Sequence, residues 1–292
     1  MGMILAKREQ HGWLRSFLIL DRVSLLPTVW SNCLAGWLLS GGGRPKTFLV
    51  LWVGVTCLYL GGLMLNNAWD APDAKHYRER LGAAGDVPAE TAGLWSLGWC
   101  GLGALFMVSL GTSTAVLTVV LLGCLTLYHM VYRLAIFSPV LRAICRFLLY
   151  LLAGSAAVTG LAGLTIWSGL ALGFYVLGFS YLAYPEDASI MRRYWPAYLL
   201  ASPFLLAWIV NGSGYRRTTL WLTLALVAWI LWCLRLAFWA AHRNPTRAAC
   251  RLSAGIILVD MLALDGGSFG LGAVFALWFV TTLVLQHFAP AS

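Results

Sequence analysis

Long apolar runs recur along almost the whole chain, and they constrain its fold more than any other feature of the sequence. The run from Phe48 to Leu65 contains no charged residue and is long enough to cross most of a bilayer as a helix. Of all residues, 60% are hydrophobic and only 11% are charged, which is not the composition of a soluble domain. A transmembrane barrel would show short alternating segments in place of continuous runs. The sequence therefore predicts an all-α, polytopic transmembrane helical bundle.

The apolar runs predict nine spans, or ten if one short run also crosses the membrane. The short run is Leu252–Leu264, which contains Asp260 and could be only half embedded. No linker interrupts the series, so residues 1–292 are expected to form a single integral-membrane domain, with a polar cytoplasmic N-terminus at 1–15 and a cytoplasmic motif loop at 66–90. The predicted spans are Phe17–Leu39, Phe48–Asn67, Thr91–Leu110, Ser113–Tyr132, Val140–Val158, Leu164–Tyr184, Tyr194–Val210, Thr219–Ala240, Leu252–Leu264 and Phe269–Phe288.

The charges of the loops predict their side of the membrane. Lys7, Arg8 and Arg15 place the N-terminus in the cytoplasm, because cytoplasmic loops are rich in basic residues. Alternate loops contain most of the other basic residues, whereas the opposite loops at 111–112 and 160–163 are uncharged. Loops of this kind meet anionic lipid headgroups, so the net charge of +9 does not indicate a nucleic-acid partner. The N-terminal segment lacks the cleavage pattern of a signal peptide, and the first span is expected to remain as an anchor.

A short polar stretch lies where the second predicted span meets a charged loop. It runs Asn66-Asn67-Ala68-Trp69-Asp70-Ala71-Pro72-Asp73. In a continuous helix Asn66, Asp70 and Asp73 fall within an arc of about 60°, although Pro72 disturbs a helix here. Grouped amide and carboxylate oxygens suit Mg²⁺, which commonly bridges to a substrate phosphate. A helix cap at the membrane surface would explain one aspartate, but a clustered face beside a span favours a functional site.

Other polar groups lie on the predicted cytoplasmic side. Arg146 is about two turns inside the fifth span, where it needs a partner or a water-filled cavity. The pair Glu186-Asp187 follows the sixth span, and the first span contains Asp21-Arg22 and Asn32. Each group alone is compatible with a structural role, such as an arginine that extends to the interface or a local ion pair. Together, two acidic clusters and several arginines on one face indicate a diphosphate site.

The order of these motifs resembles the UbiA superfamily of intramembrane prenyltransferases, in particular a short bacterial subgroup. That family has an N-D-x-x-D-x-x-x-D motif after its second helix. The stretch Asn66–Asp70 is similar to its start, with Asn67 in place of an aspartate, and Asp73 lies near its last aspartate. A second acidic motif, reduced in the subgroup, is represented by Tyr184-Pro185-Glu186. A tyrosine-to-Cys-Arg segment of the subgroup is matched by Tyr128, Arg133, Pro139, Cys145 and Arg146.

The resemblance implies transfer of an isoprenoid chain from a polyprenyl diphosphate to an unidentified acceptor, aromatic or otherwise small. It implies Mg²⁺ as the cofactor, and a site that faces the cytoplasm from a bacterial-type inner (plasma) membrane. The expected catalytic residues are Asp70, Asp73 and Arg146. The expected metal ligands are Asn66, Asp70, Asp73, Glu186 and Asp187. The expected substrate-binding residues are Asn66, Asn67, Lys75, Arg78, Tyr128, Arg133, Arg22, Asn32 and Tyr181.

Three alternatives remain open on sequence grounds. The missing acidic residues favour a catalytically decayed member that binds or helps to transport an isoprenoid lipid or product, whereas the retained face of Asn66, Asp70 and Asp73 opposes it. An alcohol phosphotransferase of the lipid-headgroup type also uses clustered aspartates, but no Gly-x-x-Ala-Arg follows Asp73. A secondary transporter would place its polar groups at the midplane of broken helices, whereas these gather on the cytoplasmic face.

Overall fold

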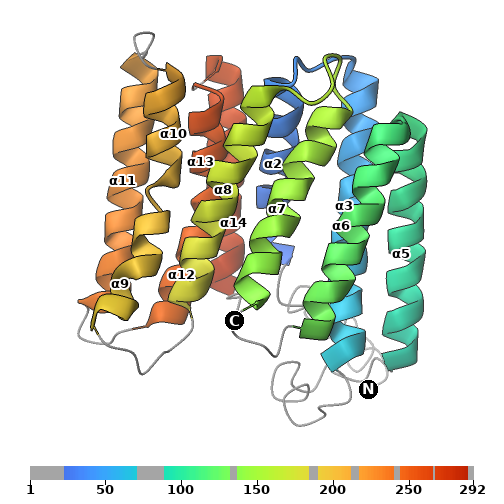
Figure 1. Cartoon of the computed structure of the whole chain (residues 1–292), viewed down its shortest axis with the longest axis horizontal. Coiled ribbons are helices and arrows are strands. Elements are labelled where there is room, and N and C mark those ends of the chain that lie inside the picture. The colour runs from blue at the N-terminus through green and yellow to red at the C-terminus, as the bar shows by residue number, and fades with distance from the viewer. Residues whose placement is uncertain are drawn as a thin grey trace, which may run out of the picture.

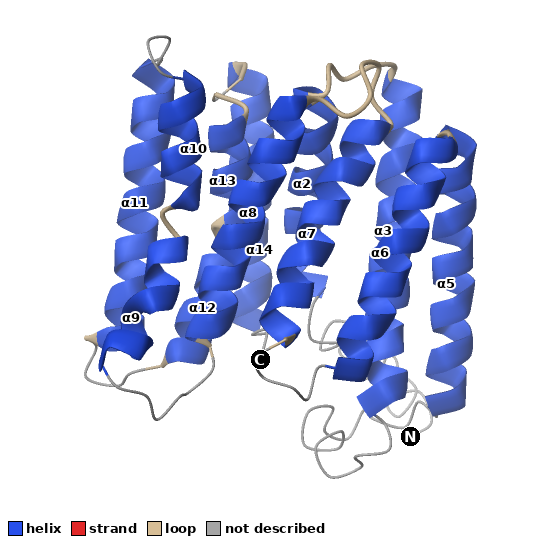
Figure 2. Ribbon diagram, viewed as in Figure 1, coloured by secondary structure: helices blue, strands red, loops and turns tan. Residues whose placement is uncertain are grey.

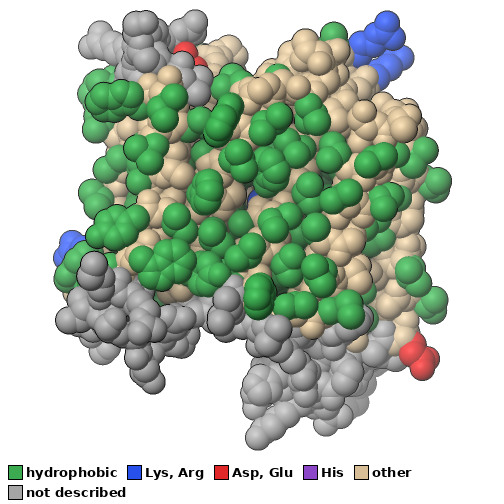
Figure 3. Space-filling view, viewed as in Figure 1, with side chains coloured by type: hydrophobic (Ala, Val, Ile, Leu, Met, Phe, Trp, Pro, Cys, Tyr) green, Lys and Arg blue, Asp and Glu red, His purple; other side chains and the backbone are tan. Residues whose placement is uncertain are grey.

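The computed structural model describes residues 23–70, 89–131, 137–183, 190–211, 217–239, 244–265 and 267–288, and every regular element in these ranges is a helix. The helices run side by side in one bundle whose helix ends gather at two opposite rims (Figures 1 and 2). Seven of the described helices are long and apolar enough to cross a membrane. Figure 3 shows hydrophobic side chains over the middle of the visible face and charged side chains at its edges. The predicted all-α membrane fold is confirmed, while the count of nine or ten spans stays a prediction.

The described helices follow the predicted spans in order. A 3₁₀ turn, η1 (Val23–Leu25), leads into the first of them. The α-helices are α2 (Leu26–Leu39), α3 (Pro45–Asp70), α5 (Ala89–Leu110), α6 (Thr112–Val131), α7 (Ser138–Ser155), α8 (Gly163–Leu182), α9 (Ile190–Leu199), α10 (Ser202–Asn211), α11 (Arg217–Phe238), α12 (Pro245–Ala254), α13 (Ile256–Ala263) and α14 (Phe269–Phe288).

Two predicted spans are broken helices in the structure. The span predicted over 194–210 is interrupted in the structure, because α9 ends at Leu199 and α10 begins at Ser202, and it stays a prediction that this pair crosses the membrane. Pro203 lies in the first turn of α10, where a residue without an N–H group fits, but it could not continue α9. The short run predicted at 252–264 begins earlier, at Pro245, and bends at Gly255 between α12 and α13. The Tyr175 hydroxyl donates to the carbonyl oxygen of Leu252 at 2.9 Å and satisfies one acceptor beside that bend.

Glycines let two pairs of helices approach closely. Between α3 and α5, a Cβ atom added at Gly61 would lie 2.4 Å from the Sγ of Cys100, and one at Gly103 would lie 2.8 Å from the backbone oxygen of Gly54. Between α2 and α7, a Cβ atom at Gly36 would lie 2.6 Å from the backbone oxygen of Tyr150. Lipid provides no hydrophobic drive for helix association, so close packing of this kind stabilises the bundle.

The helix ends near the predicted motifs lie at one rim. Helices α3, α6 and α8 end there, and α5, α7 and α12 begin there, at the lower edge in Figure 1. The turns between α2 and α3, α5 and α6, and α7 and α8 lie at the opposite rim. The first of these turns contains Gly41, Gly42 and Gly43, all at positive φ, a conformation that favours glycine. The loop charges predict that the lower rim, where α3, α6 and α8 end, faces the cytoplasm.

Candidate functional site

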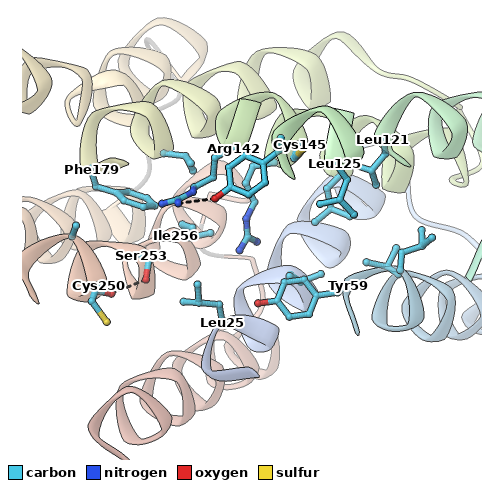
Figure 4. Close-up of a pocket in the computed structure, with 18 of the residues that line it drawn as sticks. Leu25, Tyr59, Leu121, Leu125, Arg142, Cys145, Phe179, Cys250, Ser253 and Ile256 are labelled. Carbon is cyan, nitrogen blue, oxygen red and sulfur yellow. Dashed lines mark hydrogen bonds between the residues drawn. The ribbon is translucent and has the colours of Figure 1, made fainter. Parts of the chain in front are cut away.

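A cavity of about 260 Å³ lies inside the bundle toward the lower rim. It is surrounded by side chains from η1, α2, α3, α6, α7, α8, α12 and α13, and Figure 4 labels ten of the lining residues around a common space. The walls are mostly apolar and include Val55, Leu58, Leu121, Leu125, Leu149, Val176 and Phe179. Segments far apart in the sequence thus meet around one space that suits an apolar ligand.

Two arginines of α7 provide the charge in this cavity. Arg142 and Arg146 both line it, and their spacing of four residues places them on one side of the helix, about 6 Å apart along its axis. Arg142 Nη2 donates to the hydroxyl of Tyr128 at 3.0 Å, as the dashed line from Arg142 in Figure 4 marks. The described residues that line the cavity include no aspartate or glutamate. The cavity is therefore suited to an anionic group attached to an apolar chain.

Arg146 donates hydrogen bonds to two polar side chains of α2. Its Nη1 donates to Oδ1 of Asn32 at 2.8 Å, and its Nη2 donates to the Thr28 hydroxyl at 3.0 Å. The sequence predicted that Arg146 would need a partner or a cavity, and it has both. Asn32 was predicted to bind substrate, but its contacts are with the protein, since its Nδ2 donates to Oδ2 of Asp260 at 2.8 Å.

Asp260 of α13 connects the network across three helices. Its Oδ2 also accepts from the Ser31 hydroxyl at 2.5 Å, and its Oδ1 accepts from the Tyr150 hydroxyl at 2.8 Å. Asp260, Asn32, Ser31 and Tyr150 are all fully buried, at 0% exposure. An ionised carboxylate only accepts hydrogen bonds, and three donors converge on this one. The network therefore holds α2, α7 and α13 together beside the cavity.

Sequence reasoning did not include Asp260 among the site residues, although one signal was present. A carboxylate inside an apolar run is rare and commonly functional. On α2 the polar residues Thr28, Ser31 and Asn32 also follow the i, i+3, i+4 spacing of one helix face. A polar face on one span and an isolated carboxylate on another are the pattern from which this contact could have been predicted.

Helix α3 connects the cavity to the predicted acidic motif. Tyr59 lines the cavity, and Asn66 and Asp70 lie at i+7 and i+11 from it, which places all three on one side of the helix. Asp70 is the last residue of α3, about 16 Å along the axis from Tyr59. Of Asn67 and Asp70, the structure describes the backbone. The motif thus begins on the side of α3 that faces the cavity.

The remaining predicted site residues divide into two groups. Both tyrosines were expected to bind substrate, and this stays a prediction. Tyr128 lines the cavity, whereas Tyr181 is not among its lining residues and has its ring 5.1 Å from that of Trp195. Among the residues that the structure describes, no group of three or more His, Cys, Asp or Glu side chains could hold a metal ion. The predictions at Arg22, Asp73, Lys75, Arg78, Arg133, Glu186 and Asp187 lie outside the described residues.

Comparison with known proteins gives one clear result, and it concerns the fold. No protein-family model and no curated protein matches the sequence. A solved structure of a digeranylgeranylglyceryl phosphate synthase in membranes is similar to this chain with a TM-score of 0.60 and 14% sequence identity, over 93% of this chain and 99% of that one. At this identity the similarity establishes the fold, which this chain shares with that synthase, itself a UbiA-type prenyltransferase. The resemblance predicted from the order of the motifs is confirmed at that level.

Proposed function

We propose that this chain is an integral-membrane prenyltransferase that moves an isoprenoid chain from a polyprenyl diphosphate to a small acceptor with the help of Mg²⁺. The observation that carries the proposal is the pair of arginines, Arg142 and Arg146, in the wall of an otherwise apolar cavity. The UbiA-type fold over 93% of the chain supports it. The site would face the cytoplasm of a bacterial-type plasma membrane, because the most basic loops join helices at the rim where α3 ends.

The cavity matches both parts of such a donor. A diphosphate needs charged N–H donors, and a guanidinium offers them in a planar fork that fits phosphate oxygens. An isoprenoid tail needs an apolar surface, which Val55, Leu58 and Leu149 provide beside the arginines. A substrate that is half lipid requires charge and hydrocarbon within one space.

The same residues suit the chemistry of transfer. The bond between C1 of the isoprenoid and the diphosphate oxygen breaks, the electron pair leaves on the diphosphate, C1 bonds to the acceptor, and the acceptor loses a proton. Because negative charge develops on the leaving oxygen, the N–H groups of Arg142 and Arg146 stabilise the transition state. The allylic carbon becomes electron-poor, and the rings of Tyr59, Tyr128 and Phe179 lie in the cavity wall to stabilise it. The apolar walls exclude the water that would otherwise react with it.

Magnesium belongs to the proposal through the motif at the end of α3. Asn66, Asp70 and Asp73 would hold the ion, with Glu186 and Asp187 as further ligands, and bound Mg²⁺ would neutralise the diphosphate oxygens. The register of α3 supports this arrangement, because Asn66 and Asp70 follow Tyr59 on the side that faces the cavity. The oxygen-rich chemistry of the motif fits Mg²⁺ better than a metal that prefers nitrogen or sulfur.

One observation favours a second candidate, a protein that binds an isoprenoid diphosphate without transferring it. The described cavity lining contains two arginines and no carboxylate, which is enough to bind an anion. The replacement of a motif aspartate by Asn67 would weaken the metal site on which turnover depends. Such a protein would bind the diphosphate with no release of inorganic diphosphate.

The experiment that tests the proposal compares membranes containing the wild-type chain with membranes containing Asp70→Ala. Both are supplied with radiolabelled geranylgeranyl diphosphate, with and without Mg²⁺, and the labelled lipid product and released diphosphate are measured. We expect Asp70→Ala to lower diphosphate release about 100-fold, because a positioned metal supplies several kcal/mol of transition-state stabilisation. Glu90→Ala, which removes an exposed carboxylate in the first turn of α5, is the matched control and should retain activity.

The outcomes separate the two candidates. Unchanged turnover in Asp70→Ala would remove the metal site from the proposal. Tight binding of geranylgeranyl diphosphate by the wild-type chain, with no diphosphate release under any condition, would replace the transferase by the binding protein. Release that requires both Mg²⁺ and Asp70 supports the transferase.

A further inference from the structure

A buried aspartate and a cavity arginine lie one side chain apart without pairing directly. Asn32 Nδ2 donates to Asp260 at 2.8 Å, and Arg146 donates to Oδ1 of the same amide at 2.8 Å. Opposite charges attract strongly in an apolar interior, so direct contact would be the simplest arrangement for them. Instead, the amide of Asn32 lies between the two charged groups.

Asp260 determines which way the Asn32 amide faces. Because a carboxylate only accepts hydrogen bonds, Asn32 turns its NH₂ group toward Asp260 and its oxygen toward Arg146. The Ser31 and Tyr150 hydroxyls fix the carboxylate itself, with distances of 2.5 and 2.8 Å. Asp260, Asn32, Ser31 and Tyr150 are all fully buried, so no water competes for the bonds among them. Asp260 thus sets the position of an acceptor for Arg146 that it does not itself touch.

The arrangement leaves Arg146 able to bind a ligand. A guanidinium has five N–H donors. Within the described residues Arg146 uses two of them, toward Asn32 and Thr28, and its side chain lines the cavity. A direct pair with a carboxylate would also use two donors, but in addition it would neutralise the charge of the guanidinium. With the amide in between, the remaining donors and most of the charge are available to an anion in the cavity.

We propose that Asp260 is a positioning residue for Arg146. Asp260 acts through Asn32 to hold the Arg146 guanidinium toward the diphosphate of the substrate, and it balances the charge of the guanidinium without touching it. This inference rests on the proposed function and extends it to a residue that lies outside the cavity. It predicts that Asp260 affects the binding of ligands that contain a diphosphate and has no effect on the binding of the isoprenoid tail.

Exchanging the two side chains separates this role from packing. The double variant Asn32→Asp with Asp260→Asn retains the composition, side-chain sizes and net charge of the network, but it places the carboxylate directly against Arg146. We expect it to bind geranylgeranyl diphosphate about tenfold more weakly than the wild-type chain, because the direct ion pair neutralises the charge of Arg146. Its affinity for geranylgeraniol, which has the same tail without the diphosphate, should not change. Both affinities are measured on the purified full chain in lipid nanodiscs.

A double-mutant cycle tests the route through Arg146. Asp260→Asn alone should lower the affinity for geranylgeranyl diphosphate about tenfold, and it should have no further effect in an Arg146→Gln background. Tyr150→Phe is the matched control, because it removes one donor to Oδ1 of Asp260 without touching Asn32. Its loss of affinity should be smaller than that of Asp260→Asn.

The possible results can be told apart. An exchange variant with wild-type affinity for the diphosphate, or with equal losses for diphosphate and alcohol, would overturn the role of Asp260. If that variant does not fold, the cycle decides, and an equal effect of Asp260→Asn in both backgrounds would overturn it. A wild-type chain that binds the diphosphate no more tightly than the alcohol would instead overturn the proposed function, and this inference with it.

Discussion

Two helix interfaces in this bundle differ in how far they depend on buried polar side chains. Helices α3 and α5 meet through small residues, where Gly61 packs on Cys100 and Gly103 packs on Leu58. Helices α2, α7 and α13 meet through fully buried polar side chains, with Asp260 accepting hydrogen bonds from α2 and α7. The first interface depends mainly on close van der Waals packing, with one buried hydrogen bond from the Ser96 hydroxyl to the carbonyl oxygen of Gly61 at 2.9 Å. The second combines close packing at Gly36 with a network of buried hydrogen bonds that would be costly to leave unmade.

The difference between the interfaces indicates what each contributes. Close packing of small residues stabilises a membrane bundle and places no functional group. Buried polar groups add only modest stability per hydrogen bond in lipid, but they fix the direction of every donor and acceptor. The polar interface is also the one whose arginine lines the cavity. We therefore expect changes at α2, α7 and α13 to alter ligand binding and turnover, and changes between α3 and α5 to alter stability.

The largest expected effect is the loss of activity in Arg146→Gln. The variant retains a polar side chain that can still bond to Asn32 and Thr28, but it removes the positive charge from the cavity. Loss of a preorganised donor to a developing anion costs about 100- to 1,000-fold in turnover. The measurement is prenyl transfer from geranylgeranyl diphosphate in membranes. Arg235→Gln makes the same chemical change at an exposed position of α11, and it should leave turnover unaltered. Comparable turnover in both variants would contradict a catalytic role for the polar interface.

The next effect concerns stability and tests the other interface. An alanine at position 61 would place its Cβ 2.4 Å from the Sγ of Cys100, so α3 and α5 would have to separate. Overpacking of this kind costs about 1–3 kcal/mol. We expect Gly61→Ala to unfold at a lower temperature in detergent while the folded protein retains its affinity for geranylgeranyl diphosphate. Gly98→Ala on α5 is the matched control, because a Cβ there has no atom within 4 Å. A loss of affinity without a loss of stability would mean that the two interfaces are not separate in function.

The sequence predicted local features of this molecule better than contacts between distant segments. Long apolar runs predicted the helices, and the depth of Arg146 in its span predicted that it needs a partner or a cavity. The link from Asn32 to Asp260 joins residues 228 positions apart, and no local pattern indicates which span lies beside which. The break between α9 and α10 was also missed, although Pro196 and Pro203 were visible in the sequence as signals for it.

Position around a helix was a second limit of prediction. Tyr181 is one of the residues that the family resemblance predicts to bind substrate. In the structure Phe179 lines the cavity, and Tyr181 packs against Trp195. Two positions along an α-helix turn the side chain by about 200°, so residues two apart, such as Phe179 and Tyr181, face nearly opposite sides. The absolute direction of a helix face depends on which helices surround it, and in a span that is apolar on all sides the sequence pattern does not determine it.

The smallest expected effect tests whether Arg142 belongs with Arg146 in the polar, catalytic part of the comparison. Tyr128→Phe keeps the ring in the cavity wall and removes the hydroxyl that accepts from Arg142 at 3.0 Å. Loss of one such hydrogen bond costs about 0.5–1.5 kcal/mol, so the KM for geranylgeranyl diphosphate should rise by roughly 2- to 12-fold. Melting temperature should change little, because the variant removes one hydrogen bond between α6 and α7 and keeps the ring of Tyr128 in place.

Tyr181→Phe provides the control for that measurement, since it removes a hydroxyl from the same end of the bundle at a residue that does not line the cavity. If both variants raise the KM equally, the effect belongs to the rim of the bundle and Arg142 has no specific part in binding the donor. If only Tyr128→Phe does so, both arginines of α7 act on the diphosphate through different supports. Arg146 would then depend on a fully buried network that ends at Asp260, and Arg142 on a single phenol in the cavity wall. Tyr128→Phe, which removes one support of Arg142 and leaves the arginine in place, should therefore cost less activity than Arg146→Gln.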